Sequence, residues 1–193
     1  TSGSPSTSWK STYTSGITAT QKCEFQIEYP QYGIITQQQL IYIKNYINTW
    51  EQKLMTEDMN DPKASFRDYM DVSTFVNYFI LNEATRNVDG YRLSTYLYKD
   101  KESLGGKIKM GPAWDFNIAL GNADYLNGWK TDGFVYKAME NDGGKNDYWQ
   151  VPFWWNKLMQ DASFRKALAT RWKVVRASFL NTNSINATID SAQ

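Results

Sequence analysis

Two aspartates that flank a predicted β-hairpin are the strongest candidates for chemistry in this chain. Asp89 lies just before the first predicted strand, and Asp115 lies just after the second. In an antiparallel hairpin with uniform register, these two residues face each other if the turn centres on residue 102, which falls inside the loop predicted for residues 99–106. The sequence therefore predicts that both carboxylates lie at the same end of the hairpin, within reach of one ligand.

Two carboxylates placed in this way suit phosphoryl transfer. The reaction needs one carboxylate to orient the attacking hydroxyl and another to hold a divalent cation against the phosphates. Asn87 and Asn117 are expected to lie nearby. The chain contains no histidine, which excludes Ser-His-Asp and Cys-His nucleophiles and histidine-bound zinc within it. A metal would therefore be held by carboxylates and amides, which suits Mg²⁺, Ca²⁺ or Mn²⁺.

Each aspartate also has an ordinary structural interpretation. An aspartate between a helix and a glycine, as Asp89 is, usually forms a turn by bonding its own backbone. An aspartate after a strand, as Asp115 is, often caps the next helix. These alternatives stay open for each residue alone, and the matching register of the two strengthens the functional interpretation.

The elements that position the two aspartates are a hairpin and the helix before it. Residues 91–98 are rich in β-forming side chains, and residues 107–110 alternate in polarity, so they are predicted to pair. The preceding helix is expected to run from the N-cap candidate Asp71 to about Arg86, because its apolar residues recur at helical spacing.

Further helices and one strand complete the predicted fold. Residues 22–29 alternate as in a half-buried strand, and Thr36 opens a capping box at the start of a helix. A short apolar helix is predicted near residues 151–159, and Asp161 is expected to cap a final long helix. The apolar stripe of that helix is Phe164, Leu168, Trp172, Val175 and Phe179. The fold class is therefore α+β, mainly helical, with one small hairpin at its functional edge.

Aromatic side chains make up 16% of the chain and have two interpretations. One group lies around the start of the short apolar helix and forms either part of the core or a stacking platform, and its spacing favours the core: Trp149, Phe153, Trp154 and Trp155. Tyr125 and Trp129 lie in a glycine- and asparagine-rich stretch, residues 121–150, where a long loop is often functional. These two are expected to lie closer to a ligand.

The ends, charge and composition limit the remaining possibilities. Residues 1–20 contain twelve Ser or Thr residues and are interpreted as a linker or a tail laid along the domain of residues 21–193. The net charge of +1 supplies no basic field for nucleic acid. No apolar run is long enough for a transmembrane helix. The Ser/Thr-rich start favours an extracellular or cell-surface location.

Several blocks of the sequence resemble the spore-coat protein CotH kinase family. They are Asn82-Glu83, residues 87–89 (NVD), residues 94–99 (STYLYK) and residues 111–121 (GPAWDFNIALG). The family core has the form N-x-D, then N-Y-x-L-Y, then P-W-D-x-D followed by Gly. The Trp-Asp block is the most specific part, and the resemblance runs from about Phe25 to Arg176.

This resemblance implies an atypical protein-kinase-like fold that transfers phosphate from ATP to Ser residues of secreted or coat proteins. Carried over by position, Asp89 is the catalytic aspartate and Asp115 is the ligand of Mg²⁺ or Mn²⁺, joined by Asn117. Asn87 and Ser94 fall at cofactor-binding positions. Ser94 stands where the family usually has Asn, and Asn117 replaces the second Asp of the Trp-Asp block, so two strong metal ligands are absent.

The family's β-rich N-terminal part, which carries basic residues that cradle the ATP phosphates, has no counterpart in the sequence. Residues 21–193 are therefore expected to be the C-terminal part of a CotH-like domain, with little or no activity as an isolated chain. The alternative is a non-catalytic cell-surface module that binds glycans or proteins on a degenerate kinase-like scaffold. A weaker option is a structural piece of an outer coat. The expected partner is a protein substrate or a cell-surface polymer.

Overall fold

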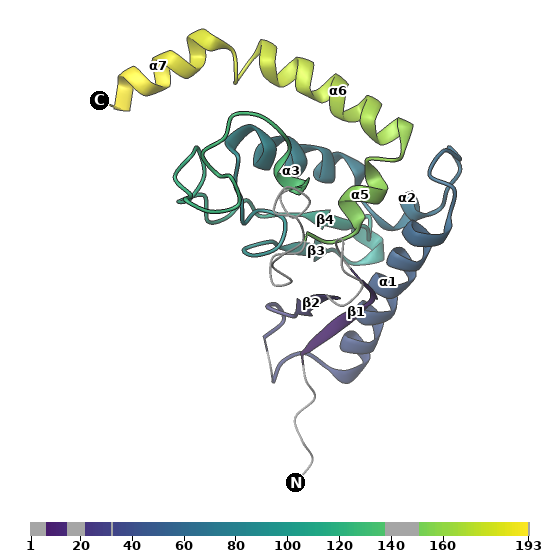
Figure 1. Ribbon diagram of the computed structural model, residues 1–193. Helices are drawn as coiled ribbons and strands as arrows, with labels where there is room; N and C mark the ends of the chain where they lie inside the picture. The colour runs from purple at the N-terminus through teal and green to yellow at the C-terminus, as the bar shows by residue number, and fades with distance from the viewer. Residues whose placement is uncertain (1–6, 15–21, 32, 138–150, 193) are drawn as a thin grey trace.

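The computed structural model describes residues 7–14, 22–31, 33–137 and 151–192. It is an α+β fold that is mainly helical, with two small antiparallel sheets of two strands each (Figure 1). The predicted fold class is therefore confirmed. The elements are β1 (Ser8–Thr14), β2 (Lys22–Gln26), α1 (Gln37–Thr56), α2 (Phe66–Tyr69), α3 (Val72–Thr85), β3 (Leu97–Lys99), η1 (Glu102–Leu104), β4 (Ile108–Met110), η2 (Val135–Lys137), α5 (Trp154–Leu158), α6 (Ala162–Ala177) and α7 (Thr182–Ala192).

The helices begin where local capping signals place them. The Thr36 side chain accepts from the backbone N–H of Gln39, and the Gln39 side chain accepts from the backbone N–H of Thr36, so α1 starts with a complete capping box. Asp71 caps α3 by accepting from the backbone N–H of Ser73. The helix ends at Arg86, whose φ of 51° turns the chain toward the candidate site. Both predicted helix starts are confirmed.

Tryptophans and phenylalanines form the centre of the core. Trp155 is fully buried and packs against Phe75, Phe79 and Tyr91, with ring centroids 5.8, 5.9 and 4.9 Å away. Trp154 packs against Trp50 in a tilted arrangement with ring centroids 4.9 Å apart, which joins α5 to α1. Offset and tilted aromatic pairs of this kind add to the free energy of apolar burial. The core interpretation of residues 153–155 is therefore confirmed, and Trp149 lies outside the described residues.

The start of the chain contains a strand that was not predicted. Within residues 1–20, interpreted as a linker or a tail laid along the domain, residues 8–14 form β1, which pairs antiparallel with β2. Trp9 stacks on Phe25 at 5.1 Å, and Ser11 is buried, where its hydroxyl donates to Glu51 of α1 at 2.7 Å. Composition missed this strand because a few contacts with the core outweigh the polar residues around them.

The hairpin exists, but it is shorter than predicted and its register differs. Leu97 pairs with Met110 and Lys99 with Ile108, while residues 91–96 form no strand. The turn is therefore centred between residues 103 and 104. Continued in this register, Asp115 faces position 92, three residues from Asp89. The predicted register is wrong because η1 and two glycines lengthen the turn asymmetrically.

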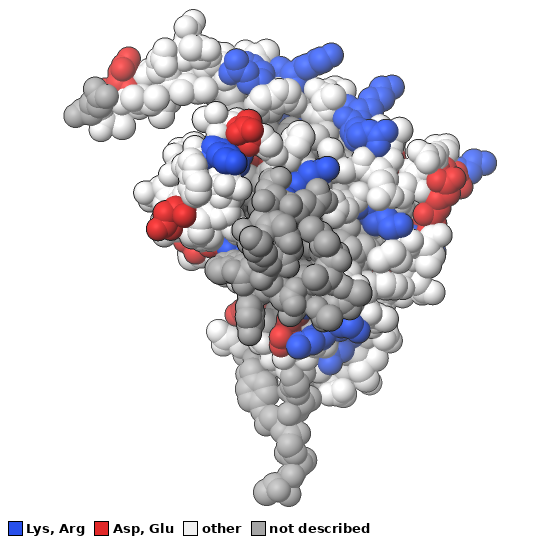
Figure 2. Space-filling view, viewed as in Figure 1, with Lys and Arg blue, Asp and Glu red and all other residues white. Residues whose placement is uncertain are grey.

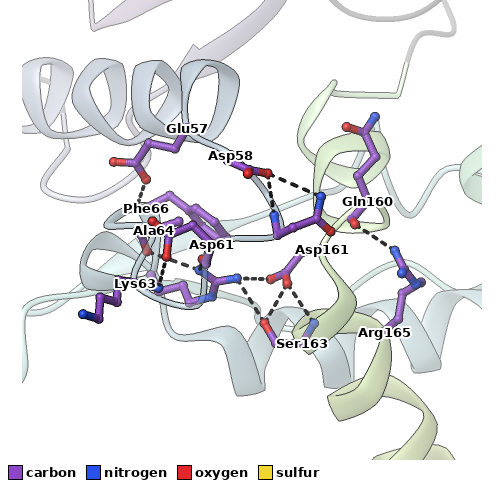
Figure 3. A network of polar contacts seen from close by, with 12 residues as sticks. Glu57, Asp58, Asp61, Lys63, Ala64, Phe66, Gln160, Asp161, Ser163 and Arg165 are labelled. Atoms are coloured by element: carbon purple, nitrogen blue, oxygen red, sulfur yellow. Dashed lines mark hydrogen bonds and ion pairs between the residues drawn. The ribbon is translucent and has the colours of Figure 1, made fainter.

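A partly buried ion pair ties α2 to the N-cap of α6 (Figure 3). Arg67 donates to Asp161 Oδ2 at 2.6 Å and to Ser163 Oγ at 3.0 Å. The other carboxylate oxygen of Asp161 accepts from the backbone N–H of Ser163 at 2.8 Å and so caps α6. The predicted cap is confirmed, and its carboxylate also serves as a tertiary contact.

The outer part of α6 is more exposed than its apolar stripe predicts. Phe164 is buried against the core, whereas Trp172 is exposed, and Phe179, also exposed, lies beyond the end of the helix at Ala177. Lys and Arg side chains gather over this helix (Figure 2). A further helix, α7, follows and buries none of its residues (Figure 1). The apolar periodicity predicted the helix correctly but not the extent of its burial.

Candidate functional site

Asp89 lies in the turn after α3, where its main-chain oxygen takes part in backbone hydrogen bonds. The backbone N–H groups of Arg92 and Leu93 donate to the main-chain oxygen of Asp89 at 3.1 and 3.0 Å. In the described part of the chain, the Asp89 side chain makes no hydrogen bond to this turn's backbone. The turn therefore presents the carboxylate to other side chains, which differs from the turn-forming interpretation.

Two side chains hold the Asp89 carboxylate. The Arg92 guanidinium forms an ion pair with Oδ1, and the Tyr125 hydroxyl lies 3.2 Å from both carboxylate oxygens. The Arg92 side chain is only 3% exposed, while that of Asp89 is 19% exposed. The carboxylate thus lies at the boundary between the interior and solvent, with its positive partner on the inner side.

The electrostatics of the two partners agree with this arrangement. Burial lowers the pKa of Arg92, and the negative charge of Asp89 opposes that effect. Burial also raises the pKa of Tyr125, and the charge of Asp89 raises it further. Tyr125 therefore keeps its proton at neutral pH and can donate it in a hydrogen bond to the carboxylate.

Asp115 lies in a second, more exposed group. Ser94 Oγ donates to Asp115 Oδ2 at 3.0 Å. Asp115 does not begin a helix, because the described residues that follow it continue as turns and irregular chain. The helix-cap interpretation is therefore wrong for this residue, and the structure instead joins two of the predicted site residues to each other.

Backbone strain is concentrated around these groups. Among the described residues, every non-glycine residue with positive φ lies between positions 86 and 127: Arg86, Ser94, Asp115, Leu120, Leu126 and Asn127. Such conformations cost free energy and persist where surrounding structure enforces them, most often at functional sites. This clustering supports the segment 86–127 as the functional part of the fold.

The two predicted asparagines have different surroundings. Asn87 is buried, and among the described residues its side-chain oxygen has no hydrogen-bond partner. Asn117 is exposed, and its main-chain oxygen accepts from Asn122 at 2.7 Å. Buried polar atoms are rarely left unpaired, so the Asn87 oxygen is one of the few unsatisfied acceptors in the described part of the chain.

Sequence reasoning expected Tyr125 to lie near a ligand but did not connect it with Asp89, and it missed Arg92. Arg92 follows Asp89 by three residues, a spacing that could have suggested a pair, whereas nothing local pointed from Asp89 to Tyr125. Gly90 was also missed as a packing residue: a Cβ there would lie 1.8 Å from Asn82 Oδ1. Only a glycine allows the turn to pack this closely against α3.

A comparison with known protein families identifies the family of the chain. A sequence model of the CotH kinase protein family matches residues 12–193. The chain belongs to this family. No curated protein and no solved structure matches it. The resemblance expected from the Trp-Asp block is therefore confirmed at the level of the family.

The CotH family implies ATP and a divalent metal, and the residues present fit a metal only with help from a substrate. No group of three or more Cys, Asp or Glu side chains comes together in the described residues. Asp115 with the Ser94 hydroxyl supplies a carboxylate and a neutral oxygen. Mg²⁺ commonly binds to one or two carboxylates, retained waters and substrate phosphates, so this donor set is adequate for a phosphate-bound metal.

None of the described helices is long and apolar enough to span a membrane.

Proposed function

We propose that the full-length protein containing this chain is a protein kinase that transfers phosphate from ATP to Ser or Thr hydroxyls of protein substrates. The observation that carries the proposal is the Asp89 carboxylate, which Arg92 and Tyr125 hold at the boundary between interior and solvent within a CotH family chain. A fixed carboxylate at the edge of solvent is what an acceptor hydroxyl needs for orientation.

In this proposal the chain's residues have separate roles. Asp89 accepts the hydroxyl proton while the acceptor oxygen forms a bond to the γ-phosphorus and the bond from phosphorus to the ADP oxygen breaks. Asp115, with Ser94 and with Asn117 nearby in sequence, would hold Mg²⁺ or Mn²⁺, which neutralises charge on the phosphates when bound. By the family resemblance Asn87 stands at a cofactor-binding position, and its side chain is buried. ADP leaves as the second product.

The isolated chain is expected to show little activity by itself. Its sequence contains no glycine-rich loop to cradle phosphates. We also propose an extracellular or cell-surface location, on the basis of the Ser/Thr-rich residues 1–20.

The test uses the full-length protein with ATP, Mg²⁺ or Mn²⁺ and a casein-type acceptor. Asp89→Asn and Asp115→Ala are each expected to lower kcat by about 100-fold or more, because each removes a group that acts in the transition state. Asp68→Asn, at an exposed position on α2, is the matched control and should retain full activity. Equal phosphorylation by the wild type and Asp115→Ala would refute the metal role of Asp115.

A non-catalytic binding module is the second candidate, and exposed aromatic residues favour it. Trp114 is 61% exposed beside Asp115, and Trp129, four residues after Tyr125, is 56% exposed. Exposed indoles can stack on sugar rings or peptide side chains. Glycan arrays and pull-downs with cell-wall polymers test this function: tight glycan binding without measurable ATP affinity would favour it over the kinase.

A further inference from the structure

The Asp89 carboxylate receives one donor from its own turn and one from a distant loop. Arg92 pairs with Oδ1, and the Tyr125 hydroxyl bridges Oδ1 and Oδ2 at 3.2 Å each. We propose that Tyr125 is a positioning residue that, together with Arg92, holds the Asp89 carboxylate so that Oδ2 faces the acceptor hydroxyl. This inference rests on the proposed kinase function.

The distribution of donors distinguishes the two carboxylate oxygens. Oδ1 faces a nearly buried guanidinium as well as the phenol. Among the described residues, Oδ2 contacts only the Tyr125 hydroxyl. A carboxylate oxygen accepts more than one hydrogen bond, so Oδ2 retains capacity for a substrate donor. Because two donors fix the carboxylate plane, an incoming hydroxyl meets an acceptor that does not need to reorient.

The loop that carries Tyr125 is anchored to α3 at several points. The backbone N–H of Leu120 donates to the main-chain oxygen of Thr85 at 2.6 Å, before Tyr125. After it, Arg86 donates to the main-chain oxygens of Asn127 and Asp132, each at 2.9 Å. These contacts fix both sides of Tyr125 relative to the helix that ends at the Asp89 turn.

Glu83 secures the far end of the same loop. Its carboxylate accepts from the backbone N–H groups of Val135 and Tyr136 at 2.7 and 3.0 Å and from the Tyr91 hydroxyl at 2.8 Å. One helix end therefore organises both the Asp89 turn and the loop that supplies its second donor. A residue 36 positions away can thus act on Asp89 with a defined geometry.

The kinetic test compares Tyr125→Phe with wild type in the full-length protein. The substitution removes only the hydroxyl, and we expect kcat to fall by about tenfold to 100-fold while the KM for ATP changes by less than about twofold. Tyr98→Phe, at an exposed tyrosine on β3, is the matched control and should match wild type. In an Asp89→Asn background, Tyr125→Phe should cause little further loss, because it acts through Asp89. A wild-type rate for Tyr125→Phe, or an equal loss in both backgrounds, overturns the inference.

A second measurement separates failure of this inference from failure of the kinase function. NMR of ¹³Cζ-labelled tyrosine follows the titration of the Tyr125 phenol, whose pKa the Asp89 charge raises. In Asp89→Asn this pKa should fall toward its ordinary value. An unchanged titration overturns the contact itself. If the Tyr125 pKa falls in Asp89→Asn but the wild-type protein transfers no phosphate, the kinase function and the catalytic part of the inference are overturned, while the contact stands.

Discussion

Two carboxylates in this protein have different surroundings: Glu51 lies in the aromatic core and Asp89 at the candidate site. Glu51 is fully buried and accepts from two neutral donors, Ser11 Oγ and Trp154 Nε1, each at 2.7 Å. Asp89 keeps an exposed edge and has a guanidinium as its counter-ion. Burial raises the pKa of Glu51 and so favours its neutral form. The comparison teaches that the core uses a carboxylate as a packing acceptor, whereas the site provides one whose charge is compensated and accessible.

Asp115 represents a third environment. It is exposed, and within the described ranges its side chain is joined to the Ser94 hydroxyl and to no cationic side chain. Its negative charge is therefore available to a metal ion, while that of Asp89 is already matched by Arg92. The two aspartates of the site are suited to different tasks, which gives direct ways to test the comparison.

The largest expected effect on stability comes from removing the counter-ion of Asp89. Arg92→Met should lower the free energy of unfolding by about 3 kcal/mol, because it leaves a largely buried carboxylate without its cation. Urea denaturation measures this, with Lys166→Met, at an exposed position on α6, as the control. A loss below about 1 kcal/mol would show that the ion pair does not support the site turn.

The second effect concerns the packing of the site turn against α3. Gly90→Ala should lower the free energy of unfolding by about 2 kcal/mol, because its Cβ would overlap Asn82 Oδ1. The double variant Asn82→Ala/Gly90→Ala should lose less than the sum of the single variants, since the overlap is gone. Additive losses in the same denaturation experiment would contradict this explanation.

Glu51, the carboxylate in the core, should make the stability of the protein depend on pH. Its pKa is raised in the folded state, so its stabilising contribution is complete below the unfolded value of 4.5 and is lost as pH rises through the folded value. Glu51→Gln should therefore show a smaller decline in stability between pH 4.5 and neutral pH than wild type. Denaturation across this range measures the slope, and Glu28→Gln, at an exposed position, should retain the wild-type slope.

The smallest expected effect on stability comes from replacing the exposed Asp115. Asp115→Asn should change the free energy of unfolding by less than about 0.5 kcal/mol, because the side chain is exposed and its bond to Ser94 is at the surface. Thermal denaturation without metal measures this change. A large destabilisation would mean that Asp115 is a structural residue, which would weaken its assignment as a metal ligand.

Much of the fold could be predicted from local sequence patterns. The capping box at Thr36 and the cap at Asp71 placed two helices correctly because each signal acts within a single turn. The strand of residues 8–14 could not be predicted in this way. Its buried contacts are with Phe25 and Glu51, which lie far along the chain, and its own composition is typical of a linker.

The candidate site was predicted only in part. The sequence pointed to both aspartates, but the hairpin register that was to align them is shifted by three residues. The length of a turn depends on its particular glycines and hydrogen bonds, and here η1 and Gly105 set it. The pairing of Ser94 with Asp115 likewise depends on two residues in positive-φ conformations, which alternation of polarity does not reveal.

By itself, the sequence determined α1, α3, α5 and α6, the caps of α1, α3 and α6, and the identity of Asp89 and Asp115 as candidates, because these depend on neighbours within a few residues. Tertiary structure alone decided what surrounds each carboxylate. Tyr125 reaches Asp89 across 36 positions because Glu83 and Arg86 hold its loop against the end of α3. Such a contact depends on the paths of two segments at once, and no local pattern in either segment specifies it.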